Sequence, residues 1–280
     1  MHGAGNDFVC IDNSEKNIVL TEKQIQFLCD RHFGIGADGV ILMEKYFDEK
    51  NENISDIFMN YYNADGTTAE MCGNGVRVTA HFAKHFWGIE TSEIKVETRS
   101  GIKPVAVDAG KKSEDLFTAN MGSAEFDSSS DFTKEAGSTV SIEDIDWHFA
   151  SMGNPHAVGF LQNVEEISEK IERVGAIVEN SVKYYPNRIN VNFVAPIDVA
   201  KNKFQVSTFE RGAGITLACG TGASASFAHI LKKYPNIETL ENKTVEIQVP
   251  GGTLFFTQDE NKNILMTGPS KIVFSGQIKV

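Results

Sequence analysis

Two stretches of this chain carry the same residue pattern, and their repetition restricts the fold more than any other sequence feature. The segment CGNG at Cys72–Gly75 begins an apolar run through Phe82, and CGTG at Cys219–Gly222 begins another through Leu231. Each run predicts a helix with a cysteine at its N-terminus, where backbone N–H groups are free and the dipole favours negative charge. A thiol there ionises more readily, and the same N–H groups can hold a carboxylate.

The repetition extends along the chain at a nearly constant interval. Cys72 and Cys219 are 147 residues apart (219 − 72), and Asn63 and Glu210, each nine residues before a cysteine, are also 147 apart (210 − 63). Three further pairs recur at intervals of 148, 146 and 151 residues: Gly5-Asn6 with Gly153-Asn154, Gly122 with Gly268, and Gly101 with Gly252. Five landmarks at almost one interval indicate an internal duplication.

Between these landmarks the sequence predicts many strands and few further helices. Thr21 followed by Gln24 fits a capping box that opens a helix ending near Arg31, and 163–174 has the apolar spacing of a surface helix. The segment GIGADG at Gly34–Gly39 has dinucleotide-loop spacing but precedes a strand, which favours a tight turn. Strands are expected at 8–11, 40–43, 57–62, 94–98, 102–107, 116–121, 147–150, 157–161, 189–194, 204–209, 245–249, 253–257, 264–267 and 272–274.

These patterns predict an α+β protein of two structurally similar lobes. The N-terminal lobe is expected at 1–117 plus 268–280 and carries Cys72, and the C-terminal lobe at 118–267 carries Cys219. A polar linker is expected within or just before 128–138, and the charged segment 44–55 predicts a surface hairpin loop. Two related lobes that face each other would place one cysteine on each side of a cleft, and the active site is expected there.

This arrangement suits the inversion of a stereocentre. A thiolate on one face of a chiral carbon removes its proton, and a thiol on the other face delivers a new one. Backbone amides aimed at the neighbouring carboxylate stabilise the carbanion. The sequence has no lysine motif of pyridoxal enzymes, no His cluster with metal-ligand spacing and no nucleotide loop. We therefore expect a reaction without cofactor or metal.

The net charge and the cysteine content limit the kinds of binding partner and the cellular compartment that we expect for this protein. With 38 acidic against 26 basic residues, the formal net charge is −12, which argues against binding to nucleic acid or to an anionic membrane. No apolar run approaches the roughly 20 residues that span a bilayer, and the first residues lack a signal-peptide pattern. Four cysteines do not form a dense disulfide framework, so a cytoplasmic protein is expected.

Other reactive side chains have simpler interpretations. Cys10 and Cys29 are expected to be buried structural residues. His81 and His85 are four residues apart, a spacing compatible with a metal, but a third ligand is not evident and we expect helix-surface histidines. Taken alone, Arg211 also fits a surface ion pair.

The duplicated motifs and their neighbours together resemble one known family. The segments that carry the resemblance are GAGNDF at Gly3–Phe8, NADG at Asn63–Gly66, AEMCGNG at Ala69–Gly75 followed by Arg77, GNPH at Gly153–His156, Asn190, and ERGAGITLACGTG at Glu210–Gly222. They extend from the start of the chain to the Gly268-Pro269 turn, and their order is highly specific. By these motifs the chain is similar to the diaminopimelate epimerases.

The resemblance implies a fold, a reaction and roles for individual residues. It implies a cytoplasmic homodimer that interconverts LL- and meso-2,6-diaminopimelate without pyridoxal phosphate, in lysine and peptidoglycan-precursor biosynthesis. Each lobe would be a mixed β-sheet or barrel around a central helix. Cys72 and Cys219 would be the acid/base residues, with His156 and Glu210 tuning their pKa values. The substrate-binding set would be Asn6, Asn63, Gly73, Asn74, Asn154, Asn190, Glu210, Arg211, Gly220 and Thr221.

That set suits a substrate with an amino-acid group at each end. Arg211 suits the distal carboxylate, and Glu210 and the amide oxygens suit ammonium groups.

Two departures from the family pattern stand out. Family members commonly begin with a few strand residues before the position of Met1, so a mis-set start or an absent first strand is expected. Ile215 stands where the family usually has Glu, which leaves a local polar contact open.

Two alternative functions share part of this pattern. A proline-racemase-like isomerase also uses two cysteines, but it typically has His after the first Cys-Gly and Ser-Pro-Cys at the second site, where this chain has Asn74 and Ala218-Cys219. A thiol-redox protein with a regulatory Cys72–Cys219 disulfide would explain two cysteines that approach each other. It would not explain two carboxylate-binding helix N-termini or the surrounding Asn and Arg residues.

Overall fold

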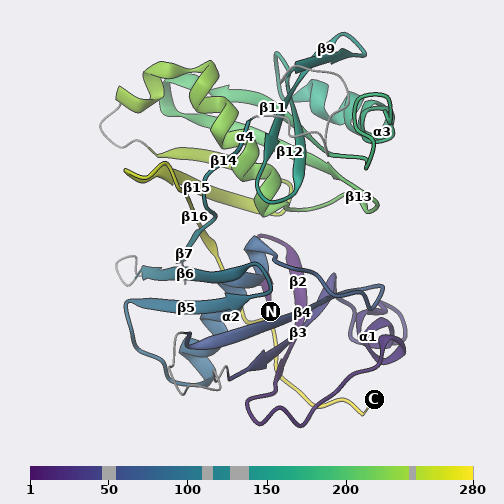
Figure 1. Ribbon diagram of the computed structural model, residues 1–280, viewed down its shortest axis with the longest axis vertical. Coiled ribbons are helices and arrows are strands. Elements are labelled where there is room, and N and C mark those ends of the chain that lie inside the picture. The colour runs from purple at the N-terminus through teal and green to yellow at the C-terminus, as the bar shows by residue number, and fades with distance from the viewer. Residues whose placement is uncertain (46–54, 109–115, 127–138, 240–243, 280) are drawn as a thin grey trace. The chain divides into compact units, whose positions relative to one another are not determined.

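The structure is a computed structural model that describes residues 1–45, 55–108, 116–126, 139–239 and 244–279 (Figure 1). The chain forms two compact units, a first unit of Met1–Asn120 with Thr267–Val280 and a second unit of Met121–Met266. The N-terminal lobe expected from the sequence consists of residues 1–117 and 268–280. The first unit of the structure consists of residues 1–120 and 267–280, so the boundaries differ by three residues and one residue. The expected linker at 128–138 and most of the expected hairpin loop at 44–55 lie outside the described residues.

The first unit is a mixed sheet with two helices. Its strands, in their order across the sheet, are β1 (His2–Gly3), β2 (Asn6–Asp12), β3 (Gly39–Glu44), β4 (Ile57–Asn63), β5 (Glu93–Thr98), β6 (Gly101–Asp108) and β7 (Leu116–Asn120). The β2–β3 and β4–β5 pairs are parallel and the other pairs are antiparallel. Helix α1 (Glu22–Cys29) connects β2 to β3, and α2 (Gly73–Phe86) connects β4 to β5.

The second unit has the same kinds of elements. Its strands, in sheet order, are β8 (Thr139–Ile142), β9 (Ile145–Ser151), β10 (Pro155–Phe160), β11 (Asn190–Asp198), β12 (Lys203–Glu210), β14 (Val245–Val249), β15 (Gly252–Gln258) and β16 (Ile264–Pro269), while β13 (Gly214–Ile215) pairs with β12. Helix α3 (Glu165–Glu179) connects β10 to β11, and α4 (Gly220–Lys233) follows β13 and precedes β14. Two 3₁₀ turns are η1 (Val199–Lys201) and η2 (Pro235–Thr239). Strand β16 begins in the second unit and ends in the first.

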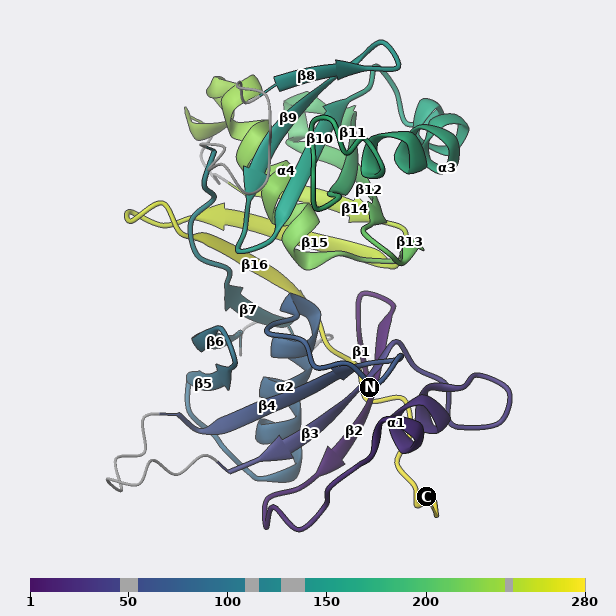
Figure 2. The same cartoon turned by 45° about the vertical axis from the view of Figure 1, so that its right-hand side comes forward.

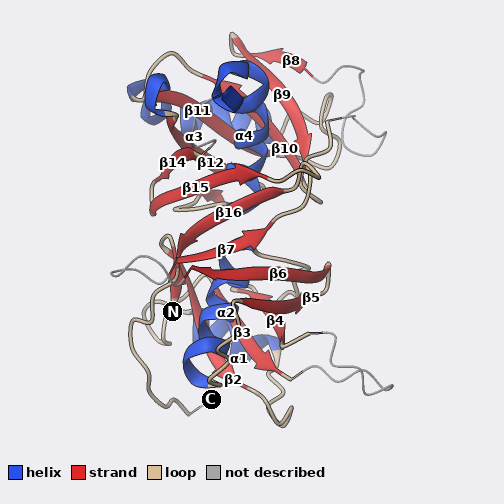
Figure 3. Ribbon diagram, turned by 90° about the vertical axis from the view of Figure 1, so that its left-hand side faces the viewer, coloured by secondary structure: helices blue, strands red, loops and turns tan. Residues whose placement is uncertain are grey.

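The two units repeat one topology. In the second unit β10–β11 and β12–β14 are the parallel pairs, and β9–β10, β11–β12 and β14–β15 are antiparallel, which reproduces the series from β1 to β6 (Figure 2). Each unit has one helix between its first parallel pair and another between its second. Helix α2 packs against strands β1 and β3–β7, and α4 packs against β9–β12 and β14 (Figure 3). The predicted α+β class with two similar lobes, each built around a central helix, is confirmed.

The helix boundaries follow from local sequence. At α1 the Gln24 backbone N–H donates to Thr21 Oγ1 (3.4 Å) and the Thr21 N–H donates to Gln24 Oε1 (2.9 Å), which is the predicted capping box. Helices α2 and α4 begin directly after Cys72 and Cys219, as predicted. Helix α3 continues to Glu179, five residues beyond its predicted end, because its apolar stripe continues.

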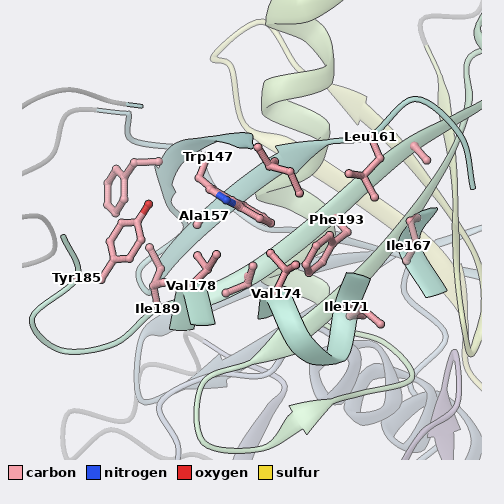
Figure 4. Packing of buried hydrophobic residues seen from close by; sticks show 14 residues of the cluster. Trp147, Ala157, Leu161, Ile167, Ile171, Val174, Val178, Tyr185, Ile189 and Phe193 are labelled. Atoms are coloured by element: carbon pink, nitrogen blue, oxygen red, sulfur yellow. The ribbon is translucent and has the colours of Figure 1, made fainter. Parts of the chain in front are cut away.

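That apolar stripe belongs to a hydrophobic core cluster of the second unit (Figure 4). Ile167, Ile171, Val174 and Val178 of α3 pack in one cluster with residues of β9, β10 and β11, and Trp147 in this cluster is fully buried. Helix α3 was predicted as a surface helix, and it is amphipathic: this face is buried while the charged face is solvent-exposed. Burial of this face gives α3 most of its stability in the folded unit.

Three predictions about local structure are wrong or incomplete. Residues 272–274 form no strand, and Val273 and Phe274 are exposed. His81 is not a surface residue, because its ring is buried, stacks on Phe117 (centroids 5.1 Å apart) and lies 3.1 Å from Ser270 Oγ. The short strands β1, β8 and β13 were not predicted, since two to four residues carry too little pattern. Across the described ranges no helix combines the length and the apolar character needed to cross a membrane.

Candidate functional site

Cys72 caps the N-terminus of α2. Its backbone is extended (φ −140°, ψ 117°), and the Gly75 N–H donates to its sulfur at 3.5 Å. A side chain at Gly75 would meet Met59 Sδ at 3.2 Å and Cys72 Cβ at 3.3 Å, so glycine keeps the first turn of the helix close to β4. The thiol therefore lies at a helix N-terminus, where backbone N–H groups and the helix dipole favour a negative charge.

A chain of polar side chains surrounds Cys72. Asn6 Oδ1 lies 3.5 Å from Cys72 Sγ and accepts from Asn74 Nδ2 at 3.2 Å, while Asn6 Nδ2 donates to Asp38 Oδ2 at 2.7 Å. The buried Asn74 accepts in turn from Arg77 Nη2 at 2.7 Å. Arg77 is fully buried, and burial lowers the pKa of its guanidinium to about 10. The structure thus brings the predicted Asn6, Asn74 and Cys72 together.

The remaining predicted residues of the first unit are Asn63 and Gly73. Asn63 ends β4, and its side-chain amide donates to Thr67 Oγ1 at 3.1 Å. Gly73 is the first residue of α2, and its carbonyl oxygen lies 3.4 Å from Arg77 Nη1. Gly73 thus lies beside Cys72, while Asn63 has its described contact within its own turn.

Cys219 repeats this geometry at α4. Its backbone is also extended (φ −109°, ψ 108°), and its sulfur accepts from the Gly222 N–H at 3.3 Å and lies 3.5 Å from Thr221 Oγ1. A Cβ at Gly222 would lie 2.3 Å from Asn192 Oδ1 and 2.9 Å from Thr208 Oγ1, so only glycine fits. Gly220, the first residue of α4, is buried and its carbonyl accepts from Ser224 Oγ at 2.8 Å. The second cysteine therefore has the same helix-capping position as the first.

A second polar chain leads from β11 to Cys219. Asn192 Nδ2 lies 3.1 Å from Ala157 O and 3.2 Å from His156 Nδ1. His156 Nε2 lies 3.0 Å from Asn154 Oδ1, and Asn154 Nδ2 donates to Thr221 Oγ1 at 3.3 Å. The structure thus links the predicted His156, Asn154 and Thr221 to Cys219.

His156 lies in a strand and is neutral. Strand β10 begins at Pro155, two residues before its predicted start, and pairs His156 with Asn190 of the parallel strand β11. Burial, with a smaller contribution from the positive charge of Arg211, lowers the pKa of His156 to about 3. His156 is therefore connected to Cys219 through a chain of hydrogen bonds and carries no charge.

Three predicted residues gather at the end of β12. The Arg211 backbone N–H donates to Asn190 Oδ1 at 3.0 Å, and Asn190 Nδ2 donates to Pro155 O at 2.9 Å. The exposed Arg211 guanidinium donates to Asn187 O at 3.2 Å, a contact with a carbonyl and not an ion pair. Glu210 Oε1 accepts from Thr216 Oγ1 at 2.6 Å. Asn190 therefore positions the backbone from which Arg211 projects.

Four residues of these polar chains received no role from the sequence: Asp38, Arg77, Asn192 and Thr208. Asn192 is two residues after Asn190 on β11, so both side chains point to the same face, and this periodicity was an available signal. Thr208 lies opposite Asn192 in the β11–β12 register and donates to Asn192 Oδ1 at 2.9 Å. Asp38 belongs to the turn at Gly34–Gly39, and its carboxylate accepts from Asn6, which lies 32 residues earlier, so no local pattern signals this contact.

The other cysteines differ from the two helix caps. Burial raises the pKa of Cys10 to about 12 and that of Cys29 to about 11, so both remain thiols near neutral pH. Cys29 is buried as predicted, and Cys10 is half-buried with its sulfur 3.8 Å from Phe8 O. Among the described residues, no group of three or more His, Cys, Asp or Glu side chains is placed to hold a metal ion.

The lowered pKa values of the buried histidines predict how the free energy of unfolding depends on pH. Burial lowers the pKa of His156 to about 3, against 6.5 for an ordinary histidine. Between these values the unfolded chain binds a proton that the folded protein does not, so the free energy of unfolding falls as pH falls below 6.5. For one histidine the slope is about 1.4 kcal/mol per pH unit. His156→Gln should remove that much of the slope between about pH 6 and 4, measured by urea denaturation.

The comparison of the two proteins isolates His156, because the carboxylates titrate in both. His229 contributes a slope of the same sign, since burial lowers its pKa to about 4, and it too is unchanged in the variant. An identical pH slope for wild type and His156→Gln would contradict a neutral, buried His156.

Known proteins resemble this chain both in sequence and in fold. A diaminopimelate epimerase from Leptospira biflexa is 36% identical over 290 residues, an alignment that covers all of this chain and 98% of that protein. A Bacillus anthracis phenazine biosynthesis protein of the PhzF family has a similar fold, with a TM-score of 0.63 at 17% identity over 96% of this chain and 92% of that one. An Agrobacterium vitis hydroxyproline epimerase has a TM-score of 0.59 at 16% identity over 96% and 86% of the two chains.

The two structural likenesses show the fold, and the sequence match shows the family. The sequence model of the diaminopimelate epimerase family matches residues 1–126 and 148–273, which include both cysteine-capped helices and all the polar side chains described around them. This chain belongs to the diaminopimelate epimerase family.

Proposed function

We propose that this protein interconverts LL- and meso-2,6-diaminopimelate by inverting one α-carbon, with Cys72 and Cys219 as the acid/base pair. The observation that carries the proposal is the repeated helix cap: each sulfur accepts a backbone N–H at the start of the central helix of its unit, at 3.5 Å for Cys72 and 3.3 Å for Cys219. The membership of the whole chain in the diaminopimelate epimerase family supplies the substrate. In that role the protein would serve lysine and peptidoglycan-precursor biosynthesis.

The reaction balances with two cysteines and no other reagent. One cysteine, as thiolate, takes the α-proton of the substrate and becomes a thiol. The other cysteine, as thiol, gives its proton to the opposite face of the carbanion and becomes a thiolate. The backbone amides of Gly73-Asn74 and Gly220-Thr221 would hold the carboxylate next to the reacting carbon and stabilise the charge that spreads into it.

The side chains near these helices suit the rest of the substrate. The exposed guanidinium of Arg211 would pair with the distal carboxylate, and a bidentate contact with a carboxylate is strong and directional. Glu210 and the amide oxygens of Asn63, Asn154 and Asn190 would accept hydrogen bonds from ammonium groups. His156 and Glu210 would act on the cysteines, His156 through Asn154 and Thr221.

The proposal is tested by incubating the purified protein with LL-2,6-diaminopimelate in deuterated water. We expect meso-diaminopimelate to form with one α-deuteron, detected by NMR and chiral chromatography. L-Proline and trans-4-hydroxy-L-proline are the matched alternative substrates, since they would be turned over by a proline-racemase-like isomerase. Turnover of either of these with none of diaminopimelate would refute the proposed substrate.

We also propose that the protein is a homodimer located in the cytoplasm, as the family resemblance implies. Two apolar side chains beside α1, Val19 and Phe33, are 86% and 82% exposed, and a subunit interface would cover such groups. The four cysteines, all within the described residues, form no disulfide, which suits a reducing compartment. Light scattering should give a mass near twice the 30.8 kDa of one chain, whereas a mass near 30.8 kDa would contradict the dimer.

A further inference from the structure

Arg77 is a fully buried arginine in the second turn of α2, and no carboxylate of the described residues pairs with it. Its Nη2 donates to Asn74 Oδ1 at 2.7 Å and its Nη1 lies 3.4 Å from Gly73 O, while Nε has no hydrogen-bond partner within the described ranges. Burial lowers the pKa of the guanidinium to about 10, so Arg77 remains charged at neutral pH. The folded protein thus holds a positive charge that is costly to bury.

The guanidinium lies at the end of α2 that carries Cys72. Side chains of a helix lean toward its N-terminus, so Arg77 reaches back by one turn to Gly73 and Asn74, the first two residues of α2. A Cβ at Gly3 of β1 would lie 3.3 Å from Arg77 Nη2 and 3.3 Å from Asn74 O, so β1 covers this end of the side chain closely. Arg77 therefore contacts the two residues whose amides would hold the substrate carboxylate.

The second unit has no such charge at the equivalent position. Ser224 is 147 residues after Arg77 (224 − 77), as Gly220 is after Gly73 (220 − 73). Ser224 is fully buried too, and its Oγ donates to Gly220 O at 2.8 Å, which is the carbonyl equivalent to the one that Arg77 contacts. The two helix N-termini therefore share this contact but differ by one positive charge.

Hydrogen bonds connect Arg77 to a carboxylate only at a distance. Asn74 Nδ2 donates to Asn6 Oδ1 at 3.2 Å, and Asn6 Nδ2 donates to Asp38 Oδ2 at 2.7 Å. Two amide groups thus separate Arg77 from Asp38, and Asp38 accepts in addition from Arg31 Nη2 at 2.8 Å. Because Asp38 has a cation of its own, the charge of Arg77 remains available to an anion that binds at the N-terminus of α2.

We propose that Arg77 is a positioning residue of the reaction, whose buried charge makes the N-terminus of α2 the main anchor of the carboxylate next to the reacting carbon. The proposal rests on the proposed function, since this carboxylate belongs to the substrate. Arg77 acts through Gly73 and Asn74 and does not touch the substrate. As the α-proton leaves, negative charge spreads into the carboxylate, so Arg77 stabilises the carbanion more than the bound substrate.

The test compares two alkylating reagents that differ by one carboxylate. Iodoacetate and iodoacetamide both react with a cysteine thiolate, which forms a sulfur–carbon bond and releases iodide. Iodoacetate carries its carboxylate on the carbon that meets the sulfur, as the substrate does. The ratio of the iodoacetate rate to the iodoacetamide rate at one cysteine does not depend on the fraction of thiolate, and it therefore measures the local preference for a carboxylate. Mass spectrometry of the digested full-length protein gives this ratio for Cys72 and Cys219 separately.

Arg77→Met should lower the ratio at Cys72 by about tenfold and leave that at Cys219 within about twofold. Two unit charges about 10 Å apart in a medium of effective dielectric constant about 20 interact strongly enough for a change of this size. Arg77→Lys keeps the charge and should retain most of the wild-type ratio. Arg77→Gln keeps an N–H donor for Asn74 without the charge and should behave like Arg77→Met. An unchanged ratio in Arg77→Met, or equal ratios in Arg77→Gln and Arg77→Lys, would overturn the proposal.

Lys84→Met is the matched control, because it removes a positive charge from the last turn of the same helix. It should leave the ratio at Cys72 within about twofold of wild type. In epimerisation assays Arg77→Met should raise KM and lower kcat, each by about tenfold, and Lys84→Met should change neither. Arg77→Met should unfold within about 5 °C of wild type, since an apolar side chain replaces a buried charge without a carboxylate partner. A purely structural role would lower the unfolding temperature and leave the ratio unchanged.

The alkylation ratio can be measured whether or not the protein epimerises diaminopimelate. A lowered ratio at Cys72 in Arg77→Met, together with a wild-type protein that does not turn over diaminopimelate, would contradict the proposed function and leave the carboxylate anchor in place. A wild-type protein that epimerises diaminopimelate, together with an unchanged ratio in Arg77→Met, would contradict only the role of Arg77.

Discussion

Replacing either Cys72 or Cys219 with alanine should lower kcat/KM for diaminopimelate epimerisation by about 10⁴-fold or to the detection limit. Each substitution removes the proton donor or acceptor on one face of the α-carbon, and inversion requires both faces. Each sulfur also caps its helix through a backbone N–H, so a small loss of stability is expected beside the loss of activity. The measurement is meso-diaminopimelate formed from the LL isomer, with α-deuterium incorporation followed in the same sample.

The matched control is Cys10→Ala, which removes a thiol from the first unit away from the helix cap. Cys10 lies in β2 with its sulfur 3.8 Å from Phe8 O, and its replacement should leave kcat/KM within about twofold of wild type. Thermal denaturation of all three variants separates lost chemistry from lost folding. Substantial epimerase activity in a folded Cys72→Ala or Cys219→Ala protein would rule out the two-cysteine mechanism.

Trp147→Ala should lower the free energy of unfolding of the second unit by about 3–5 kcal/mol. The indole is fully buried, stacks edge-on against Phe193 (centroids 5.1 Å apart) and donates to Ile142 O at 3.1 Å. Gly159 leaves room for it, since a Cβ there would lie 2.6 Å from the ring. Against a typical total of about 5–15 kcal/mol, this loss is large. Urea denaturation followed by far-ultraviolet circular dichroism measures it.

The second tryptophan of the chain provides the control. Trp87 is half-buried at the end of α2, and its indole N–H donates to Asp12 Oδ2 at 3.1 Å. Trp87→Ala removes a side chain of the same size but much less buried area, and should cost under about 2 kcal/mol. In Trp147→Ala the remaining fluorescence comes from Trp87 and reports the first unit alone. An equal loss of stability in the two variants would contradict the assignment of Trp147 to the core.

The duplication and the helix caps could be predicted because their signals are local. A Cys-Gly pair before an apolar run, repeated after 147 residues, places Cys72 and Cys219 at equivalent helix starts without any knowledge of tertiary structure. The capping box of Thr21 and Gln24 is likewise complete within four residues. Parallel or antiparallel pairing of the strands, by contrast, was left open by these signals.

The contacts that were missed depend on residues far apart in the sequence. Asp38 acquires a role because β2 and β3 pair in parallel and bring it next to Asn6, 32 residues earlier. His81 is buried because Phe117 and Ser270, 189 residues away, cover a helix face that looks polar in sequence. The 272–274 run has the composition of a strand, but the chain makes its last ladder contact at Lys271 and residues 272–274 are not in a strand. A segment with the composition of a strand forms one only where the edge of another strand is available to pair with it.

The return of the chain from the second unit to the first sets the order in which the protein can be completed during synthesis. The first unit lacks Thr267–Val280 until the second unit has been synthesised, and with it the Lys271 pairing to His2 and the Ser270 contact with His81. The second unit, Met121–Met266, is an uninterrupted stretch. A chain that leaves the ribosome from its N-terminus therefore completes the unit of Cys219 before that of Cys72, the reverse of their order in the sequence.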